Sequence, residues 1–169
     1  HRYDTGDYKV PDPMLGTVED FQAMCQAAHE KGIKVILDGV YSHTGSRSPY
    51  FEAACASKDS PFYHWYTFHH YPDDYNAWWG FDTLPAVNEL DPGFIRYIGS
   101  DANRVVAYWL SLGADGFRLD VADELPTEFL SLLKKRLRQL KPDALLLGEV
   151  WEDASNKIAY GQRRKYFVD

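Results

Sequence analysis

Three short apolar runs of this chain each end in a carboxylate. They are residues 33–38, ending in Asp38, residues 116–120, ending in Asp120, and residues 144–149, ending in Glu149. Each run follows a segment with helical periodicity, and this alternation of strand and helix predicts a parallel sheet. Ligands bind at the carboxyl ends of parallel strands. We therefore expect the three acids to share one rim and to act there, although a lone strand-end Asp often only caps the next helix.

Two of these acids have surroundings that predict opposite pKa shifts. Arg118 lies two residues before Asp120, so both side chains point to the same face, where a guanidinium holds a carboxylate ionised. Glu149 has Leu147 and Trp151 on its face and neutral neighbours, which raise a carboxyl pKa. An ionised Asp and a protonated Glu make a nucleophile and a general acid. Neighbouring strands about 4.8 Å apart suit the roughly 5–5.5 Å between the carboxyls of a retaining glycosidase.

The segments that position these runs have helical patterns. A capping box of Thr17 and Asp20 is expected to begin the first helix, and Ser100 or Asp101 to cap the second. Pro126 suits the first turn of the third helix. The apolar stripes expected to face the core are Phe21, Met24, Cys25 and Ala28, then Val105, Tyr108, Trp109 and Leu112, then Phe129, Leu130, Leu133, Leu137 and Leu140.

Residues 44–99 have no sustained periodicity, and Pro and Gly recur among them. More than half of the Phe, Tyr and Trp residues of the chain lie in this segment. A structureless loop of this length is uncommon inside a compact domain, so we expect a small irregular subdomain. Because the segment leaves from the carboxyl end of a strand, it should overhang the rim that carries the acids.

Composition excludes several classes of partner. The formal net charge of −7 and the absence of a basic block argue against nucleic acid or an anionic membrane. Cys25 and Cys55 are too few for a disulfide scaffold, and no apolar run approaches the roughly 20 residues of a membrane span, so a soluble protein is expected. Because the chain starts at His1 without a Met or a signal peptide, we interpret it as a segment of a larger protein, and the missing targeting signal then says little about location. A cytoplasmic location is favoured.

Three blocks resemble, in order and spacing, signature blocks of the α-amylase family of glycoside hydrolases. They are Asp-Gly-Val-Tyr-Ser-His at 38–43, Gly-Phe-Arg-Leu-Asp-Val-Ala-Asp-Glu at 116–124 and Gly-Glu-Val-Trp at 148–151. Residues 121–124 and 149–151 are most similar to the neopullulanase and cyclomaltodextrinase branch. The resemblance implies an α/β fold that is part of a (β/α)8 TIM barrel. Residues 1–43 and 100–169 would form about the third to fifth βα units, and residues 44–99 the inserted domain B.

The resemblance also implies roles for individual residues. Asp120 would be the nucleophile, and Glu149 would protonate the leaving oxygen and then activate water. The implied substrate-binding residues are His43 at the cleaved sugar, Arg118 orienting the nucleophile, Trp151 on the acceptor side and Asp38 bracing the strand end. A purely structural histidine is the alternative for His43. The rings of the insertion are expected mainly to form its core, with sugar stacking as the alternative for any one ring.

The chain departs from the family pattern in places that matter for function. Ser42 stands where many relatives have a calcium-binding Asn, so no metal or other cofactor is expected. Ala86 and Val87 replace the usual Lys-Leu of the domain B block. The third carboxylate of the family would lie beyond Asp169, so these 169 residues alone are expected to be inactive. Their exposed strand edges are expected to drive homo-oligomer formation.

The expected function is retaining hydrolysis of α-1,4 bonds, with α-1,6 bonds as further candidates, in an α-glucan such as starch, pullulan or a cyclodextrin. The alternatives are a transglycosylase on the same scaffold, a non-catalytic amylase-like protein that binds sugars or a partner, and a metal hydrolase using Asp38, His43 and Asp120. Intact Asp120, Arg118 and Glu149 disfavour the non-catalytic protein. The absence of a second His at ligand spacing disfavours the metal hydrolase.

Overall fold

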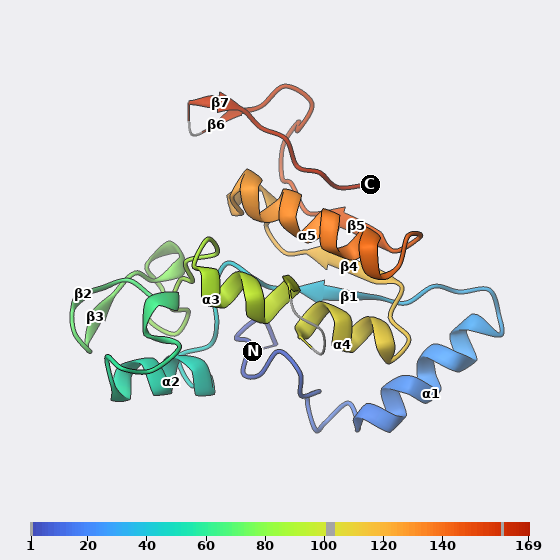
Figure 1. The fold of residues 1–169 in the computed structure, drawn as a ribbon, viewed down its shortest axis with the longest axis horizontal. Coiled ribbons are helices and arrows are strands. Elements are labelled where there is room, and N and C mark those ends of the chain that lie inside the picture. Colours follow the sequence, from blue (N-terminus) through green and yellow to red (C-terminus); the bar gives the residue numbers. More distant parts are fainter. Residues whose placement is uncertain (1, 101–103, 160) are drawn as a thin grey trace.

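The computed structural model describes residues 2–100, 104–159 and 161–169. Within this part of the chain the main sheet is parallel, with the strand order β1-β4-β5 (Figure 1). Its strands are β1 (Ile36–Gly39), β4 (Gly116–Leu119) and β5 (Leu145–Gly148). The parallel sheet predicted from the alternation of strand and helix is confirmed.

The register brings two of the three acids to the same level of the rim. Gly39 pairs with Leu119, and Leu119 pairs with Gly148. Directly beyond these pairs, the N–H of Asp120 donates to the carbonyl of Gly39, and the N–H of Glu149 donates to the carbonyl of Leu119. The strand ends therefore lie side by side, and each is followed at once by a carboxylate.

The first strand differs from its predicted bounds at both ends. It begins at Ile36 rather than Ile33, because the N–H of Val35 donates to the carboxylate of Asp115 instead of to a neighbouring strand. It also runs one residue further, since Gly39 still pairs with β4. Asp38 consequently lies inside the strand and is not its last residue.

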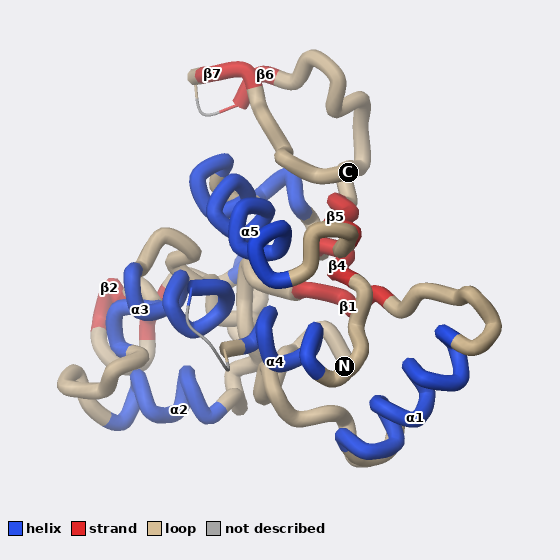
Figure 2. The backbone as a smooth tube through the Cα atoms, turned by 45° about the vertical axis from the view of Figure 1, so that its right-hand side comes forward, coloured by secondary structure: helices blue, strands red, loops and turns tan. Residues whose placement is uncertain are grey.

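Helices α4 and α5 lie in front of the strands, whereas α1 lies to one side of them (Figures 1 and 2). The helices that alternate with the strands are α1 (Val18–His29), α4 (Val105–Ser111) and α5 (Thr127–Leu140). Pro126 occupies the N-cap of α5, next to the first turn in which it was predicted.

The predicted helix caps have different outcomes. The capping box of α1 is confirmed, because the Thr17 hydroxyl accepts the N–H of Asp20 and the Asp20 carboxylate accepts the N–H of Thr17. The cap predicted at Asp101 lies outside the described residues. Ser100 is the last residue of a π-helical turn, and α4 begins after Arg104, so Ser100 is not its cap.

Two residues of the predicted apolar stripes face solvent. The Met24 residue is 50% exposed and the Leu140 residue 38% exposed, and the other stripe residues are buried or half-buried. Helix α1 packs through the ring of Phe21, 5.0 Å from that of Trp109, and through buried Cys25. Because α1 touches the rest of the fold along this narrow line, its neighbour Met24 stays outside the contact.

The segment after β1 is an irregular unit with an aromatic core. Its helices and strands are α2 (Pro49–Ala56), β2 (Phe68–His70), β3 (Asp74–Tyr75) and α3 (Pro92–Ile95), with helical turns η1 (Tyr63–Trp65), η2 (Trp78–Gly80) and η3 (Arg96–Ser100). The rings at the centre of its core are Tyr50, Phe51, Trp65, Tyr66 and Phe94, each no more than 5% exposed. Phe62, Phe68, Tyr75 and Tyr97 pack against this core, so most of the aromatic rings of the segment serve packing.

Residues 83–87 return beside the segment that leaves β1. The N–H of Val87 donates to the carbonyl of Ser42, and the N–H of Thr44 donates to the carbonyl of Pro85. An isolated antiparallel bridge joins His43 to Ala86 between them. These bonds hold the unit against the carboxyl ends of the strands, as its point of departure predicts.

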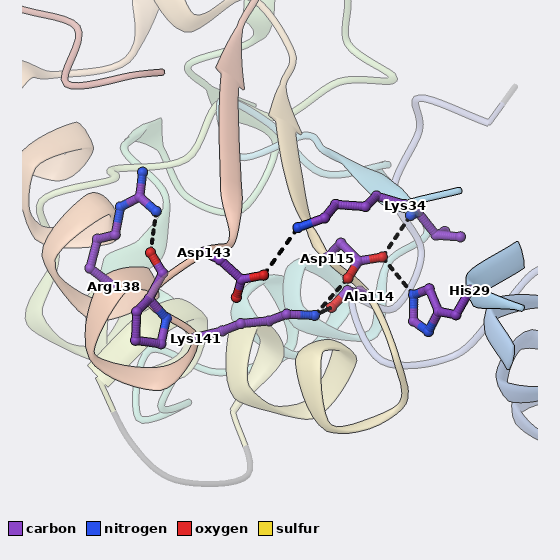
Figure 3. Close-up of polar contacts among 9 residues, drawn as sticks. His29, Lys34, Ala114, Asp115, Arg138, Lys141 and Asp143 are labelled. Carbon is purple, nitrogen blue, oxygen red and sulfur yellow. Dashed lines mark hydrogen bonds and ion pairs between the residues drawn. The ribbon is translucent and has the colours of Figure 1, made fainter. Parts of the chain in front are cut away.

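A buried carboxylate joins three elements at the opposite end of the sheet. The Asp115 residue, only 5% exposed, accepts the N–H of Val35 at 2.8 Å and lies 2.7 Å from His29 Nε2 and 2.7 Å from Lys141 Nζ. Figure 3 shows these groups converging on Asp115, whereas Lys34 reaches Asp143. Burial disfavours the charge of Asp115, but Lys141, Val35 and His29 together hold its pKa well below its usual value.

Replacing Asp115 with Asn in the full-length protein is expected to destabilise it by roughly 3 kcal/mol, because Lys141 would lose a buried partner. The folded pKa of Asp115 lies below the unfolded value of about 4, so its contribution is complete above that pH and is lost as the pH falls through the folded pKa. Urea unfolding midpoints of the wild type and Asp115→Asn should therefore converge only in acid.

Asp143→Asn is the matched control, since Asp143 forms a solvent-exposed pair with Lys34 and should change stability little. An Asp115→Asn midpoint equal to that of the wild type at neutral pH would contradict a stabilising role for this network.

The last residues pack beside β5 and the loop after β4. A hairpin of β6 (Ile158–Ala159) and β7 (Gln162–Arg163) precedes Arg164, which donates to the carbonyl of Leu125. The N–H of Asp169 donates to the carbonyl of Leu146, so the tail covers part of the outer edge of β5. The expected association through strand edges stays a prediction. Among the described residues, no helix is both long and apolar enough to span a bilayer.

Candidate active site

One guanidinium gathers the three predicted acids at the rim of the sheet. Arg118 Nη1 lies 2.6 Å from Asp38 Oδ1 and 2.9 Å from Asp120 Oδ1, and its Nη2 lies 2.7 Å from Glu149 Oε1. The hydroxyl of Tyr3 donates to the second oxygen of Asp38 at 2.7 Å. The prediction that Arg118 and Asp120 share a face is confirmed. The register explains the other two contacts, because it sets Arg118 opposite Asp38 and opposite Leu147, two residues before Glu149 and on the same face of the sheet.

The predicted pKa shift of Asp120 is wrong in direction. Burial raises the pKa of Asp120, and Arg118 opposes this increase only in part, while Glu149 and Asp38 add to it. The side chain of Asp120 is 10% exposed, against 43% for Asp38 and 29% for Glu149. The positive charge of Arg118 thus stabilises three carboxylates at once. Asp120 is the most buried of the three, so its ionised form has the largest desolvation cost.

The predicted pKa shift of Glu149 is also wrong in direction. Burial alone would raise the pKa of Glu149, but the N–H of Val121, the side chain of Trp151 and the charge of Arg118 outweigh it and lower the pKa. The N–H of Val121 donates to Glu149 Oε2 at 3.0 Å. The residues next to Glu149 in sequence are apolar, but those around it in space donate hydrogen bonds.

Val121 has a left-handed backbone, with φ 41° and ψ 53°. This region is unfavourable for a β-branched residue, and such strain is concentrated at functional sites. The conformation turns the chain immediately after Asp120 and directs the N–H of Val121 at Glu149. No sequence pattern identified Val121, since nothing in the residue type indicates a positive φ.

His43 is 2% exposed, and both of its ring nitrogens have partners within the chain. Nε2 lies 3.0 Å from the carbonyl oxygen of Tyr3, and Nδ1 lies 2.9 Å from Ser42 Oγ. Burial lowers the pKa of His43, so the imidazole is neutral near pH 7. This geometry fits the structural alternative, and the sugar contact expected for His43 stays a prediction.

Three tryptophans stand beside the acid cluster. The rings of Trp78 and Trp79 are stacked 5.2 Å apart, and Trp151 meets Trp79 edge-on at 5.6 Å. The carboxylate of Glu124, in the loop after β4, accepts the indole N–H groups of both Trp78 and Trp79. We call Trp78, Trp79 and Trp151 the tryptophan wall. Trp151 was predicted as a site residue, but the roles of Glu124 and of the other two rings were missed, because only the fold brings these segments together.

The hydroxyl of Ser42 is buried and lies 2.9 Å from His43 Nδ1. In residues 2–100, 104–159 and 161–169, no group of three or more His, Cys, Asp or Glu has the arrangement of a metal site. The metal-hydrolase alternative built on Asp38, His43 and Asp120 therefore gains no support from the geometry. That the protein needs no calcium stays a prediction.

Parallel strands that alternate with helices and end in a cluster of acids define this chain as part of a (β/α)8 barrel, the class that binds ligands at this rim. The sequence profile "Alpha amylase, catalytic domain" matches residues 1–166. The chain belongs to the alpha-amylase family.

Named relatives lie within the same family. The chain is 36% identical to amylopullulanase of Thermoanaerobacterium saccharolyticum, covering 92% of this chain and 14% of that protein. It is 33% identical to neopullulanase 2 of Thermoactinomyces vulgaris, covering 92% and 27%. The native structure of the Nostoc punctiforme debranching enzyme matches with a TM-score of 0.82 at 36% identity, covering 90% and 33%. The chain thus spans about a third or less of each of these relatives.

Proposed function

We propose that the protein carrying this chain hydrolyses α-glucosidic bonds of pullulan, cyclodextrins or maltooligosaccharides, with retention of the anomeric configuration. The observation that carries the proposal is the placement of Asp120 and Glu149 on the two ends of one guanidinium, at the level where adjacent parallel strands end. Adjacent strands lie about 4.8 Å apart, which suits the roughly 5–5.5 Å between the two carboxyls of a double displacement. The names of the relatives support the substrate class.

In the first step, a carboxylate oxygen of Asp120 attacks the anomeric carbon while Glu149 gives its proton to the leaving glycosidic oxygen. The bond to the leaving sugar breaks and a β-glycosyl ester forms. In the second step, Glu149 takes a proton from water, and the resulting hydroxide breaks the ester and restores the carboxylate of Asp120. Each step inverts the anomeric carbon, so the product keeps the α configuration.

The lowered pKa of Glu149 in the absence of substrate means that this mechanism must also explain how Glu149 becomes protonated. Glu149 is held ionised by Arg118 and Val121, yet it must be protonated to act as the acid. We propose that a bound glucan buries the carboxyl of Glu149 and shifts Arg118 toward Asp120. That change would raise the pKa of Glu149 and favour the ionised form of Asp120, which are the directions that catalysis needs.

The test is an assay of the full-length protein on pullulan, β-cyclodextrin, starch and maltotriose, with the anomer released first followed by NMR. We expect reducing sugar from at least one glucan and the α anomer in the initial product. Initial release of the β anomer would contradict the double displacement. Products longer than maltotriose in the maltotriose digest would instead support the transglycosylase, whereas glucose and maltose alone indicate hydrolysis.

We also propose that residues 1–169 alone release no sugar, because the sheet they form among the described residues is not a closed barrel. The resemblance to the family further implies a third carboxylate outside this sequence. Comparing the 169-residue chain with the full-length protein in the same assay checks this. Sugar release by the short chain above that of the same chain carrying Asp120→Asn would contradict the proposal.

A further inference from the structure

A single carboxylate fixes two neighbouring rings of the tryptophan wall. Trp78 Nε1 donates to Glu124 Oε2 and Trp79 Nε1 donates to Glu124 Oε1, each at 2.7 Å. Each carboxylate oxygen thus accepts one indole N–H, and the two stacked rings lie only 19° from parallel. The insertion and the loop after β4 are joined here through side chains, so the orientation of both rings depends on Glu124.

Trp79 is held in a conformation that its residue type disfavours. Its backbone is left-handed, with φ 51° and ψ 25°, and the residue is 62% exposed. Strain of this kind persists where the surroundings enforce it, and it is concentrated at functional sites. Core packing does not explain it, because a ring held in solvent gains little from burial. Exposed Trp79 is in contact with exposed Trp151, and a contiguous exposed apolar patch of this kind marks a ligand-binding groove.

The wall runs from Trp151, next to the acid cluster, to Trp78, next to His43. Trp79 meets Trp151, which is 61% exposed and lies two residues after Glu149. At the other end, Trp78 lies 5.1 Å from the ring of His43. The side chain of Trp151 is hydrogen-bonded to Glu149, so the exposed end of the wall that carries Trp151 lies beside that carboxyl. An indole face complements the C–H face of a glucosyl ring, which is the least polar surface that a glucan presents.

We infer that Glu124 is a positioning residue, which fixes the Trp78–Trp79 pair so that Trp79 and Trp151 bind a glucosyl ring next to the bond that is cleaved. This inference rests on the proposed function for its substrate class. Each oxygen of Glu124 accepts one indole N–H, so the role assigned to Glu124 is to hold the rings. Its effect on the sugar passes through the rings, and that distinguishes it from a residue that binds a sugar hydroxyl directly.

The test uses four variants of the full-length protein: Glu124→Gln, Trp79→Phe, the double variant, and Phe81→Ala as the control. Phe81 is an exposed ring after the same turn, and within the described residues it makes no ring contact with the wall. The Kd of β-cyclodextrin is measured by calorimetry with each change made in Asp120→Asn, so that the sugar is not hydrolysed, and kcat and KM on maltotriose are measured without that change. We expect Glu124→Gln and Trp79→Phe each to raise Kd and KM about fivefold, with kcat changed less than about twofold.

The double variant tests whether Glu124 acts on the sugar through Trp79 or binds a sugar hydroxyl directly. If Glu124 acts through Trp79, the double variant should bind no more weakly than the weaker single variant, because both changes break the same contact. A double variant whose loss of affinity equals the product of the two single losses would overturn the inference. So would an unchanged Kd in both single variants, provided that their near-UV circular dichroism matches that of the wild type. A wild type that binds β-cyclodextrin in a Glu124-dependent way but hydrolyses no glucan would refute the proposed function alone.

Discussion

Replacing Asp120 with Asn in the full-length protein is expected to lower kcat on α-glucans by roughly 10⁴-fold. The amide has almost the shape of the carboxylate, but it is a poor nucleophile and cannot form the glycosyl ester. The loss should be equally large on α-maltosyl fluoride, whose leaving group needs little protonation, because the missing function is attack and not proton donation. Initial rates of reducing-sugar and fluoride release measure both effects.

Binding provides the control for Asp120→Asn. The Kd of β-cyclodextrin for Asp120→Asn should lie within a few-fold of the wild-type KM for the same sugar, because the variant keeps the tryptophan wall and the fold. A variant that binds and still turns over pullulan or maltotriose at the wild-type rate would remove Asp120 from the mechanism. The same result would leave the position of Arg118, between the carboxyls of Asp120 and Glu149, without a catalytic explanation.

Glu149→Gln is expected to lower kcat/KM on maltotriose by about 10³-fold, because the leaving sugar would depart without a proton. On α-maltosyl fluoride the loss in kcat/KM should shrink to less than about tenfold, since kcat/KM reports the formation of the ester and fluoride leaves readily. The ratio of the two losses is the quantity to measure. It separates a general acid from a residue that only supports the fold.

Equal losses on maltotriose and α-maltosyl fluoride would contradict the general-acid role of Glu149. Asp120→Asn is the matched comparison, because it should lose activity equally on both substrates. The contrast between the two variants assigns the roles without reference to the pKa values of the free chain.

Much of the fold could be predicted from local signals in the sequence. Apolar runs that alternate with helical stripes predict a parallel sheet, and the Thr17/Asp20 pair marks the start of α1. The shared face of Arg118 and Asp120 follows from the two-residue period of a strand. These features depend on neighbours in sequence, and each was confirmed. Exposed Met24 was missed because the width of a helix contact depends on distant segments.

The electrostatics could not be read from the sequence for a similar reason. The apolar neighbours of Glu149 predict a raised pKa, but the N–H of Val121 reaches Glu149 only because Val121 has a positive φ. Likewise, Arg118 was expected to serve Asp120 alone, and its division among three acids appears only once the register is known. The link from Glu124 to Trp79 joins segments far apart in the chain, and neither residue type indicates it.

The anomeric configuration of glycosyl azides tests the pairing of Asp120 and Glu149 most directly. Azide can replace either carboxylate in the corresponding Ala variant, with α-maltosyl fluoride as the donor. We expect Asp120→Ala to give β-maltosyl azide by one inversion, and Glu149→Ala to give α-maltosyl azide, because azide would then open the ester on Asp120. Exchanged configurations, or the same anomer from both variants, would contradict the division of roles proposed for these two residues.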